Sequence, residues 1–140
     1  MRTLLDLQIT RDLQQDSGLS ATDYDVLSTL SEKPDGRWRA RDLAAQLLWS
    51  TSRLAHHVGR MEQRGLVARQ PCADDARGAL ISLTEAGRAT LDEAAAPHVA
   101  SVRRHMIDLL TADEIAALDT IAGKVITHLA GRVPADLPPR

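Results

Sequence analysis

The chain has 140 residues, a formal net charge of −2 and an apolar content of 44%, which excludes a disordered tail and allows one domain with a buried core. Aromatic residues make up only 2%, so the core must be built from Leu, Val, Ile and Ala, a composition that favours helices. The single cysteine, Cys72, excludes an internal disulfide and a zinc site made of several thiolates. Because the sequence shows no signal peptide and no run near the ~20 apolar residues of a membrane span, we expect a cytoplasmic protein with no membrane partner.

The first third of the chain predicts two helices. Residues 3–16 have an apolar position every fourth residue and end before Gly18. The sequence "SATD" at 20–23 is typical of a capping box that opens a second helix, and "KPDG" at 33–36 predicts the turn after it.

The centre of the chain predicts two short helices joined by a tight turn and followed by a hairpin. A short extended piece around Trp38 precedes a helix over 40–48. A second helix runs from Ser50 to Arg64, where Gly65 predicts a left-handed stop. The strand-like runs 66–71 and 79–83 then flank "CADDARG", which is rich in turn formers. We therefore predict a mainly α fold with a small β-hairpin wing, a winged helix-turn-helix with N- and C-terminal dimerisation helices.

Two more helices are expected in the C-terminal part. Thr84 caps a long helix over 85–110, which Pro97 should kink or divide, and "TADE" at 111–114 is a capping box for a last helix. Together with the first helix they carry more apolar surface than one small winged helix can cover, which favours a C2 homodimer. Such a dimer would place two recognition helices about 34–36 Å apart, one turn of B-DNA.

The second helix of the central pair has two different faces. Leu54, Val58 and Met61 are expected to point inward with Ala55 beside them. A helix of about 14 residues is about 21 Å long and fits a major groove, where hydroxyls, imidazoles and guanidiniums donate to phosphates and base edges. The residues predicted to face outward and contact DNA are Ser50, Ser52, Arg53, His56, His57 and Arg60.

Charge and the hairpin support the same interpretation. Between Arg37 and Arg77 the segment carries +4 and the rest of the chain −6, a localised basic surface that suits a polyanion, although arginines are also common on ordinary helix surfaces. At the hairpin tip Arg77 can enter a minor groove, with Asp75 holding its guanidinium. The alternative is an ordinary exposed turn whose salt bridge contributes about 0–1 kcal/mol.

Two motifs give this region a family resemblance. The wing pattern Asp75-Ala76-Arg77-Gly78 is followed by Leu83, Thr84 and Gly87 of an "LT-x-x-G" motif. With these motifs the chain resembles the MarR family of transcriptional regulators from about Leu4 to Leu129. The resemblance implies an obligate homodimer with interleaved terminal helices on a pseudo-palindromic operator of double-stranded DNA, with Arg77 in the minor groove and the recognition-helix residues named above near the major groove.

The resemblance also implies a function and a division of the chain. We expect a sequence-specific DNA-binding regulator, a homodimeric repressor released by a small aromatic or phenolic effector bound between its two parts. Residues 1–140 would form a single domain, with the DNA-binding part at 20–84 and dimerisation helices at 1–19 and 85–132. The chain starts late for this family, which predicts a shorter dimer arm or a start further upstream.

Rival interpretations concern single residues. The side chains of His56 and His57 diverge by about 100° on a helix and cannot readily share a metal ion, so we predict no metal. No Ser, Cys or Asp stands in a recognisable relation to them, so we predict no catalytic residue, and we expect no cofactor. The main alternative interpretation is that the outward face of this helix is an ordinary solvated surface that binds no ligand. Two alternatives for the whole chain are a winged-helix interaction protein without specific DNA binding and a redox sensor acting through Cys72.

Overall fold

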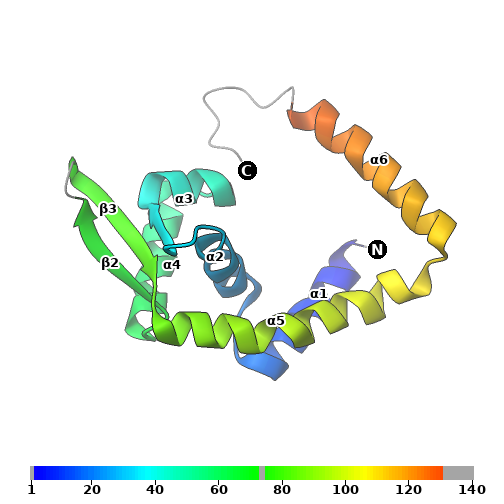
Figure 1. Cartoon of the computed structure of the whole chain (residues 1–140), viewed down its shortest axis with the longest axis horizontal. Helices are drawn as coiled ribbons and strands as arrows, with labels where there is room; N and C mark the ends of the chain where they lie inside the picture. The colour runs from blue at the N-terminus through cyan, green and yellow to red at the C-terminus, as the bar shows by residue number, and fades with distance from the viewer. Residues whose placement is uncertain (1, 73–74, 131–140) are drawn as a thin grey trace.

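The computed structural model describes residues 2–72 and 75–130, and it confirms the predicted fold class. Figure 1 shows a winged helix-turn-helix at one end, α5 running away from its sheet with α1 alongside, and α6 projecting from the far end of α5. The elements are α1 (Arg2–Ser17), α2 (Ala21–Ser31), β1 (Arg37–Arg39), α3 (Ala40–Leu47), α4 (Thr51–Gln63), β2 (Val67–Cys72), β3 (Asp75–Leu83), α5 (Glu85–His105), the 3-10 turn η1 (Ile107–Leu109) and α6 (Ala112–Ala130).

The sheet has three antiparallel strands in the order β1-β3-β2. The predicted hairpin is the pair β2–β3, and the predicted extended piece around Trp38 is β1, which pairs with β3 through Trp38 and Ile81. The register shifts between Pro71 and Cys72, so the hairpin is irregular toward its tip. Proline has no N–H to donate to a ladder, which fits its place beside this irregularity.

The core lies where α2, α3 and α4 meet the sheet. Leu54, Val58 and Met61 are buried as predicted, with relative exposures of 0–1%. Ala55 was expected beside them, and that expectation is wrong, because the structure leaves Ala55 exposed. The other large side chains of this core include Leu19, Val26, Leu27, Leu30, Leu43, Val67 and Ile81.

Local signals at the helix ends are confirmed by the geometry. Ser20 and Asp23 form a reciprocal capping box, in which the Ser20 hydroxyl accepts from the Asp23 N–H and the Asp23 carboxylate accepts from the Ser20 N–H. Gly65 has φ +73° where α4 ends, the left-handed conformation expected there. Thr111 and Glu114 form a second box at the start of α6.

The C-terminal helices differ from the prediction in two respects. Pro97 does not divide α5, which continues through it. The carbonyl left without its helical partner belongs to Glu93, an exposed residue of the helix, where water can donate a hydrogen bond to it. The helix also ends at His105, earlier than predicted, and Leu109 is 73% exposed in the turn that follows. No helix in the described ranges is both long enough and apolar enough to cross a bilayer.

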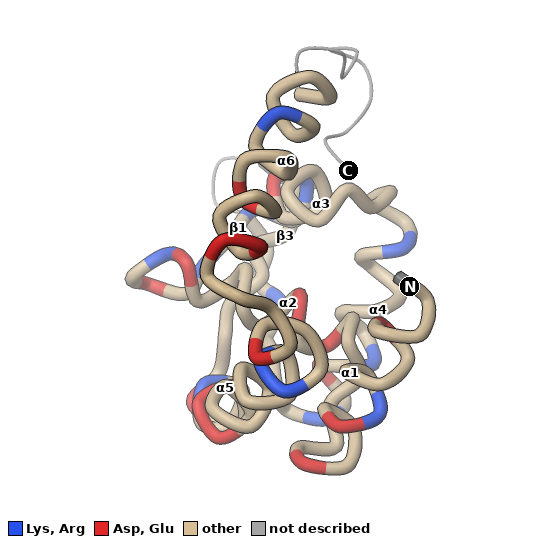
Figure 2. The backbone as a smooth tube through the Cα atoms, turned by 90° about the vertical axis from the view of Figure 1, so that its right-hand side faces the viewer, with Lys and Arg blue, Asp and Glu red and all other residues tan. Residues whose placement is uncertain are grey.

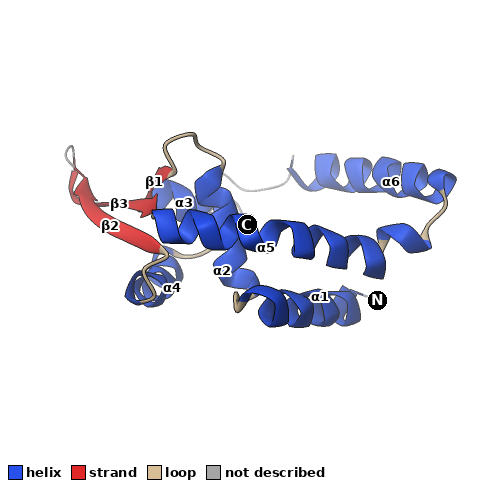
Figure 3. Cartoon of the chain, turned by 60° about the horizontal axis from the view of Figure 1, so that its bottom comes forward, coloured by secondary structure: helices blue, strands red, loops and turns tan. Residues whose placement is uncertain are grey.

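A polar cluster fixes α1 on α5, which lie side by side in Figure 3. Asp12 of α1 accepts hydrogen bonds from the Ser101 hydroxyl (2.7 Å), from Arg104 Nη2 (2.8 Å) and from Gln8 Nε2 (3.0 Å). His105 Nε2 lies 3.0 Å from the same carboxylate. The Ser101 hydroxyl, followed by Arg104 and His105, holds the pKa of Asp12 well below its usual range, so Asp12 is a carboxylate at neutral pH.

Candidate nucleic-acid interface

The exposed face of α4 is built by the turn that precedes it. Leu48 closes α3 in the left-handed conformation with φ 63°, and Ser50 then caps α4 by accepting from the Arg53 N–H at 3.2 Å. This turn directs one face of α4 outward. As predicted, Ser50, Ser52, Arg53, His56 and Arg60 are all exposed.

Trp49 supports the exposed face from below. It is only 7% exposed and belongs to the core, so it is a packing residue at the turn. The guanidinium carbon of Arg53 lies 4.3 Å from the centre of its ring, a cation–π contact. Arg53 is thus held over a rigid surface rather than extended freely into solvent.

The prediction that His57 faces outward is wrong. Its relative exposure is 7%, and its ring meets Trp49 edge-on with centroids 5.4 Å apart. The apolar stripe of α4 is wider than the i, i+4, i+7 positions used to predict it, and position i+3 from Leu54 is His57. His57 therefore belongs to the buried face, and His56 is the histidine that remains exposed.

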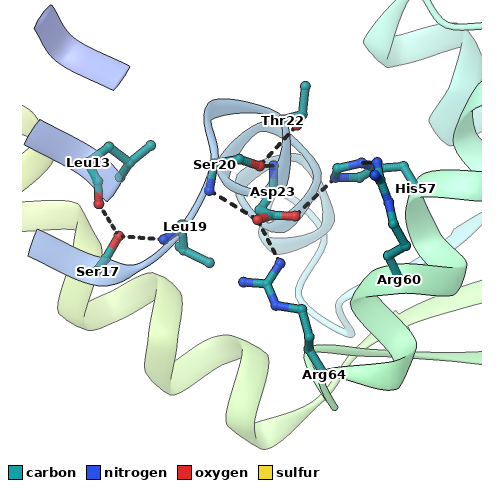
Figure 4. A network of polar contacts seen from close by, with 9 residues as sticks. All are labelled: Leu13, Ser17, Leu19, Ser20, Thr22, Asp23, His57, Arg60 and Arg64. Atoms are coloured by element: carbon teal, nitrogen blue, oxygen red, sulfur yellow. Dashed lines mark hydrogen bonds and ion pairs between the residues drawn. The ribbon is translucent and has the colours of Figure 1, made fainter. Parts of the chain in front are cut away.

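His57 belongs to a cluster around Asp23, shown in Figure 4. Its Nε2 lies 3.1 Å from Asp23 Oδ1, within ion-pair distance although not aligned as a hydrogen bond. Arg64 Nη1 donates to Asp23 Oδ2 at 2.8 Å. Neither Asp23 nor Arg64 was among the predicted site residues. The only clue in the sequence was the capping-box acid Asp23, whose second role requires a contact with a residue 41 positions away.

The pKa values of His57 and Asp23 are shifted in directions that fit this geometry. Burial lowers the pKa of His57, and the Arg60 and Arg53 charges lower it further against the opposing effect of Asp23. Burial alone would raise the pKa of Asp23, but the hydrogen bonds from Arg64 and Ser20 outweigh it and the pKa is lowered. A neutral imidazole thus faces a carboxylate whose main ionic partner is Arg64.

The wing is fastened to α4 by Arg69 of β2. The Arg69 N–H donates to Glu62 Oε1 and its Nη2 donates to the Ala55 carbonyl, both at 3.1 Å. The two predicted wing residues, Asp75 and Arg77, have their backbone in β3, while their side chains lie outside the described part of the structure. Their contacts with DNA stay a prediction.

The "LT-x-x-G" motif joins the wing to α5. The Thr84 hydroxyl donates to the Gly65 carbonyl at 2.7 Å and accepts from the Gly87 N–H at 2.9 Å. Any Cβ at Gly87 would collide with the Leu66 carbonyl oxygen. In this motif Thr84 caps α5. Gly87 has no side chain, so the backbone at Leu66, just before β2, can lie directly against the helix.

Other candidate chemistry gains no support from the geometry. Cys72 is half-buried at the end of β2. Over 2–72 and 75–130, no three His, Cys, Asp or Glu side chains are grouped as metal ligands would be.

These features define a winged helix-turn-helix protein with a polar, cation-bearing second helix. The MarR family model matches residues 17–78. The chain is also similar over nearly its whole length to solved members of that family, and it belongs to the MarR family of transcriptional regulators.

Two solved structures and one curated protein illustrate the relationship. AbsC, a MarR family regulator from Streptomyces coelicolor, is 43% identical, with 93% of this chain and 87% of that chain covered and a TM-score of 0.83. Sco3205 from the same organism, solved in complex with DNA, is 36% identical, with coverages of 99% and 86% and a TM-score of 0.86. The transcriptional regulator PecS of Dickeya dadantii (strain 3937) is 29% identical over 112 residues, which are 79% of this chain and 67% of PecS.

Proposed function

We propose that this regulator binds a pseudo-palindromic operator in double-stranded DNA as a homodimer, represses transcription there, and is released by a small-molecule effector. The observation that carries the proposal is the exposed face of α4. It presents hydroxyl, imidazole and guanidinium donors, and no ion pair among the described residues engages Arg53 or Arg60. Donors of this kind suit phosphates and base edges in a major groove.

A second copy of the chain supplies the geometry that one α4 lacks. The helix has 13 residues and is therefore about 20 Å long, enough to read one half-site. Two such helices about 34 Å apart would meet the major groove on the same side of the duplex. The DNA complex of Sco3205, at 36% identity, supports DNA as the partner.

The unpaired apolar surface supports the homodimer. None of the residues of α6 is buried, and its exposed apolar residues include Ile121 (59%), Val125 (50%) and Leu129 (56%). Between α1, the end of α5 and α6 lies a groove of about 640 Å³ lined mainly by leucines and other apolar residues. A surface of this kind is typical of an interface, and a C2 pairing would cover it on both copies at once.

Operator binding is tested by fluorescence anisotropy with the intergenic DNA beside the protein's own gene, against an unrelated duplex of equal length. Arg53→Ala is expected to weaken operator binding about tenfold, as loss of one good contact does. Arg103→Ala, which removes an exposed arginine of α5 paired with Asp108, is the control and should leave affinity unchanged. Equal binding of both duplexes by the wild-type protein would contradict sequence-specific recognition.

The wing has its own test. If Arg77 contacts a phosphate, Arg77→Ala weakens operator binding and lowers the slope of log affinity against log salt by about 1. An unchanged affinity and slope would remove Arg77 from the interface.

Repression and effector release are tested together with a reporter gene placed under the control of the same intergenic DNA. Deletion of the regulator should raise expression of the reporter, and a phenolic effector should do the same in the intact strain.

A further inference from the structure

A buried histidine lies directly behind the two exposed arginines of α4. His57 approaches the Arg60 guanidinium on one side, with 3.0 Å between Nδ1 and Nη2, and the edge of Trp49 on another. Trp49 in turn lies under Arg53. Both cations of the proposed DNA-binding face are therefore linked to one buried imidazole (Figure 4 shows the Arg60 side).

The chemistry of the contact fixes the protonation of this ring. A guanidinium has only donors, so Arg60 must donate to Nδ1, and Nδ1 must carry a lone pair. The remaining hydrogen of a neutral imidazole is then on Nε2, which lies 3.1 Å from the Asp23 carboxylate. Asp23 is itself fixed by Ser20 and Arg64, so the orientation of His57 is determined from α2.

We propose that His57 is a positioning residue for DNA recognition, which holds the Arg60 guanidinium through Nδ1 and supports Arg53 through Trp49. The inference rests on the proposed function, because it concerns how the DNA-binding face is presented. It assigns His57 no contact with DNA, since the ring is buried. Of the five N–H donors of Arg60, His57 engages one and leaves the others for phosphate or base acceptors.

The proposal also predicts how acid affects binding. The charged groups that act on His57 are Asp23 from α2 and Arg53 and Arg60 from α4. Protonation would place an N–H on Nδ1 against the Arg60 guanidinium, which abolishes the hydrogen bond and adds repulsion between like charges. Acidification should therefore release Arg60 in the wild-type protein.

Two amide substitutions separate the two nitrogens of the ring. The side-chain amide of Asn reaches the position of Nδ1, so His57→Asn can still accept from Arg60 but loses contact with Asp23. Gln reaches the position of Nε2, so His57→Gln keeps an N–H near Asp23 but loses Arg60. We expect His57→Gln to weaken operator binding about five- to tenfold and His57→Asn by less than half of that factor.

The same substitutions in an Arg60→Ala background show whether the effect passes through Arg60. With Arg60 absent, His57→Gln should weaken binding less than twofold further, because coupled residues are not additive. A full effect of His57→Gln in that background, or equal affinity of the wild type, His57→Asn and His57→Gln, would overturn the proposal. If instead the wild-type protein fails to prefer the intergenic duplex, the proposed function fails and the inference with it.

A measurement on the free wild-type protein keeps the proposal testable if a variant does not fold. Nitrogen-15 NMR of the histidine rings should show His57 as the Nε2–H tautomer at pH 7, and Arg60→Ala should weaken its preference for that tautomer. A ring protonated at Nδ1 at pH 7 would overturn the assignment. Urea unfolding of each variant confirms that affinities are compared between folded proteins.

Discussion

The winged-helix part and the α6 arm use apolar residues in opposite ways. In the winged helix, Val26, Leu27, Leu30, Leu43 and Val58 are each 0% exposed, and they come from three different helices. In α6 every residue is exposed, although the helix is rich in Ile, Leu and Val. Figure 2 shows how few charged positions interrupt it; beyond its first turn they are Asp119 and Lys124.

This contrast indicates that the two regions obtain their stability from different sources. The winged helix buries its apolar surface within one chain, which contributes about 25 cal/mol per Å² of buried area. In the α6 arm the same kind of apolar surface is exposed in a single chain. It can contribute this stabilising free energy only when another molecule covers it. Folding of the first region should therefore be independent of protein concentration, and ordering of the second should depend on it.

The largest expected effect comes from a charge in the α6 stripe. Leu118 lines the groove beside α1, and Leu118→Asp would place a carboxylate in the apolar interface of the proposed dimer. We expect the dissociation constant of the dimer to rise at least about 100-fold, since an unpaired buried charge costs several kcal/mol. Analytical ultracentrifugation across a concentration series measures it.

Thr120→Asp is the matched control for this prediction. It adds the same charge two residues further along, about 160° away around the helix axis. We expect Thr120→Asp to dimerise as the wild type does. A wild-type dissociation constant for Leu118→Asp would show that the apolar stripe of α6 is not the interface.

The second prediction tests the joint between the wing and α5 at Gly87. Gly87→Ala would drive a methyl group into the Leu66 carbonyl and should lower the free energy of unfolding by about 1–3 kcal/mol. Gly59→Ala, inside α4 where a Cβ meets nothing, should raise it by about 0.5–1 kcal/mol through its better helix propensity. Urea unfolding of both variants measures the difference; the same sign for both would show that Gly87 is not constrained by close approach.

Local signals in the sequence were sufficient for most of the fold. The capping box at Ser20 and Asp23, the left-handed stop at Gly65 and the hairpin all depend on residues close in sequence, and the structure confirms each of them. Whether α5 continues through Pro97 or is divided there was left open by the sequence, because it depends on whether the unpaired carbonyl reaches water; the structure shows one continuous helix.

The site was less accessible to such reasoning. The outward orientation of Arg53, His56 and Arg60 follows from helical periodicity and is confirmed. The burial of His57 depends on Trp49 and on Asp23, which α2 contributes from another part of the chain. Periodicity describes one helix at a time, so it cannot show which polar residue a neighbouring helix will cover and satisfy.

The smallest expected effect concerns the contact between α1 and α5. This contact differs from both regions compared above, because a polar cluster around Asp12 contributes to it. The native pKa of Asp12 is far below the ordinary 3.8 of the unfolded chain, so the native state binds fewer protons there. Stability from Asp12 is therefore complete above about pH 5 and is lost as the pH falls through 3.8 toward the lowered native pKa.

Asp12→Asn should flatten the pH dependence of unfolding between pH 7 and pH 3, whereas Asp16→Asn, one turn later and exposed, should leave that pH dependence unchanged. Thermal unfolding at the two pH values measures this, and equal slopes for the two variants would show that α1 is held on α5 by the apolar contacts of residues such as Leu13 rather than by the carboxylate.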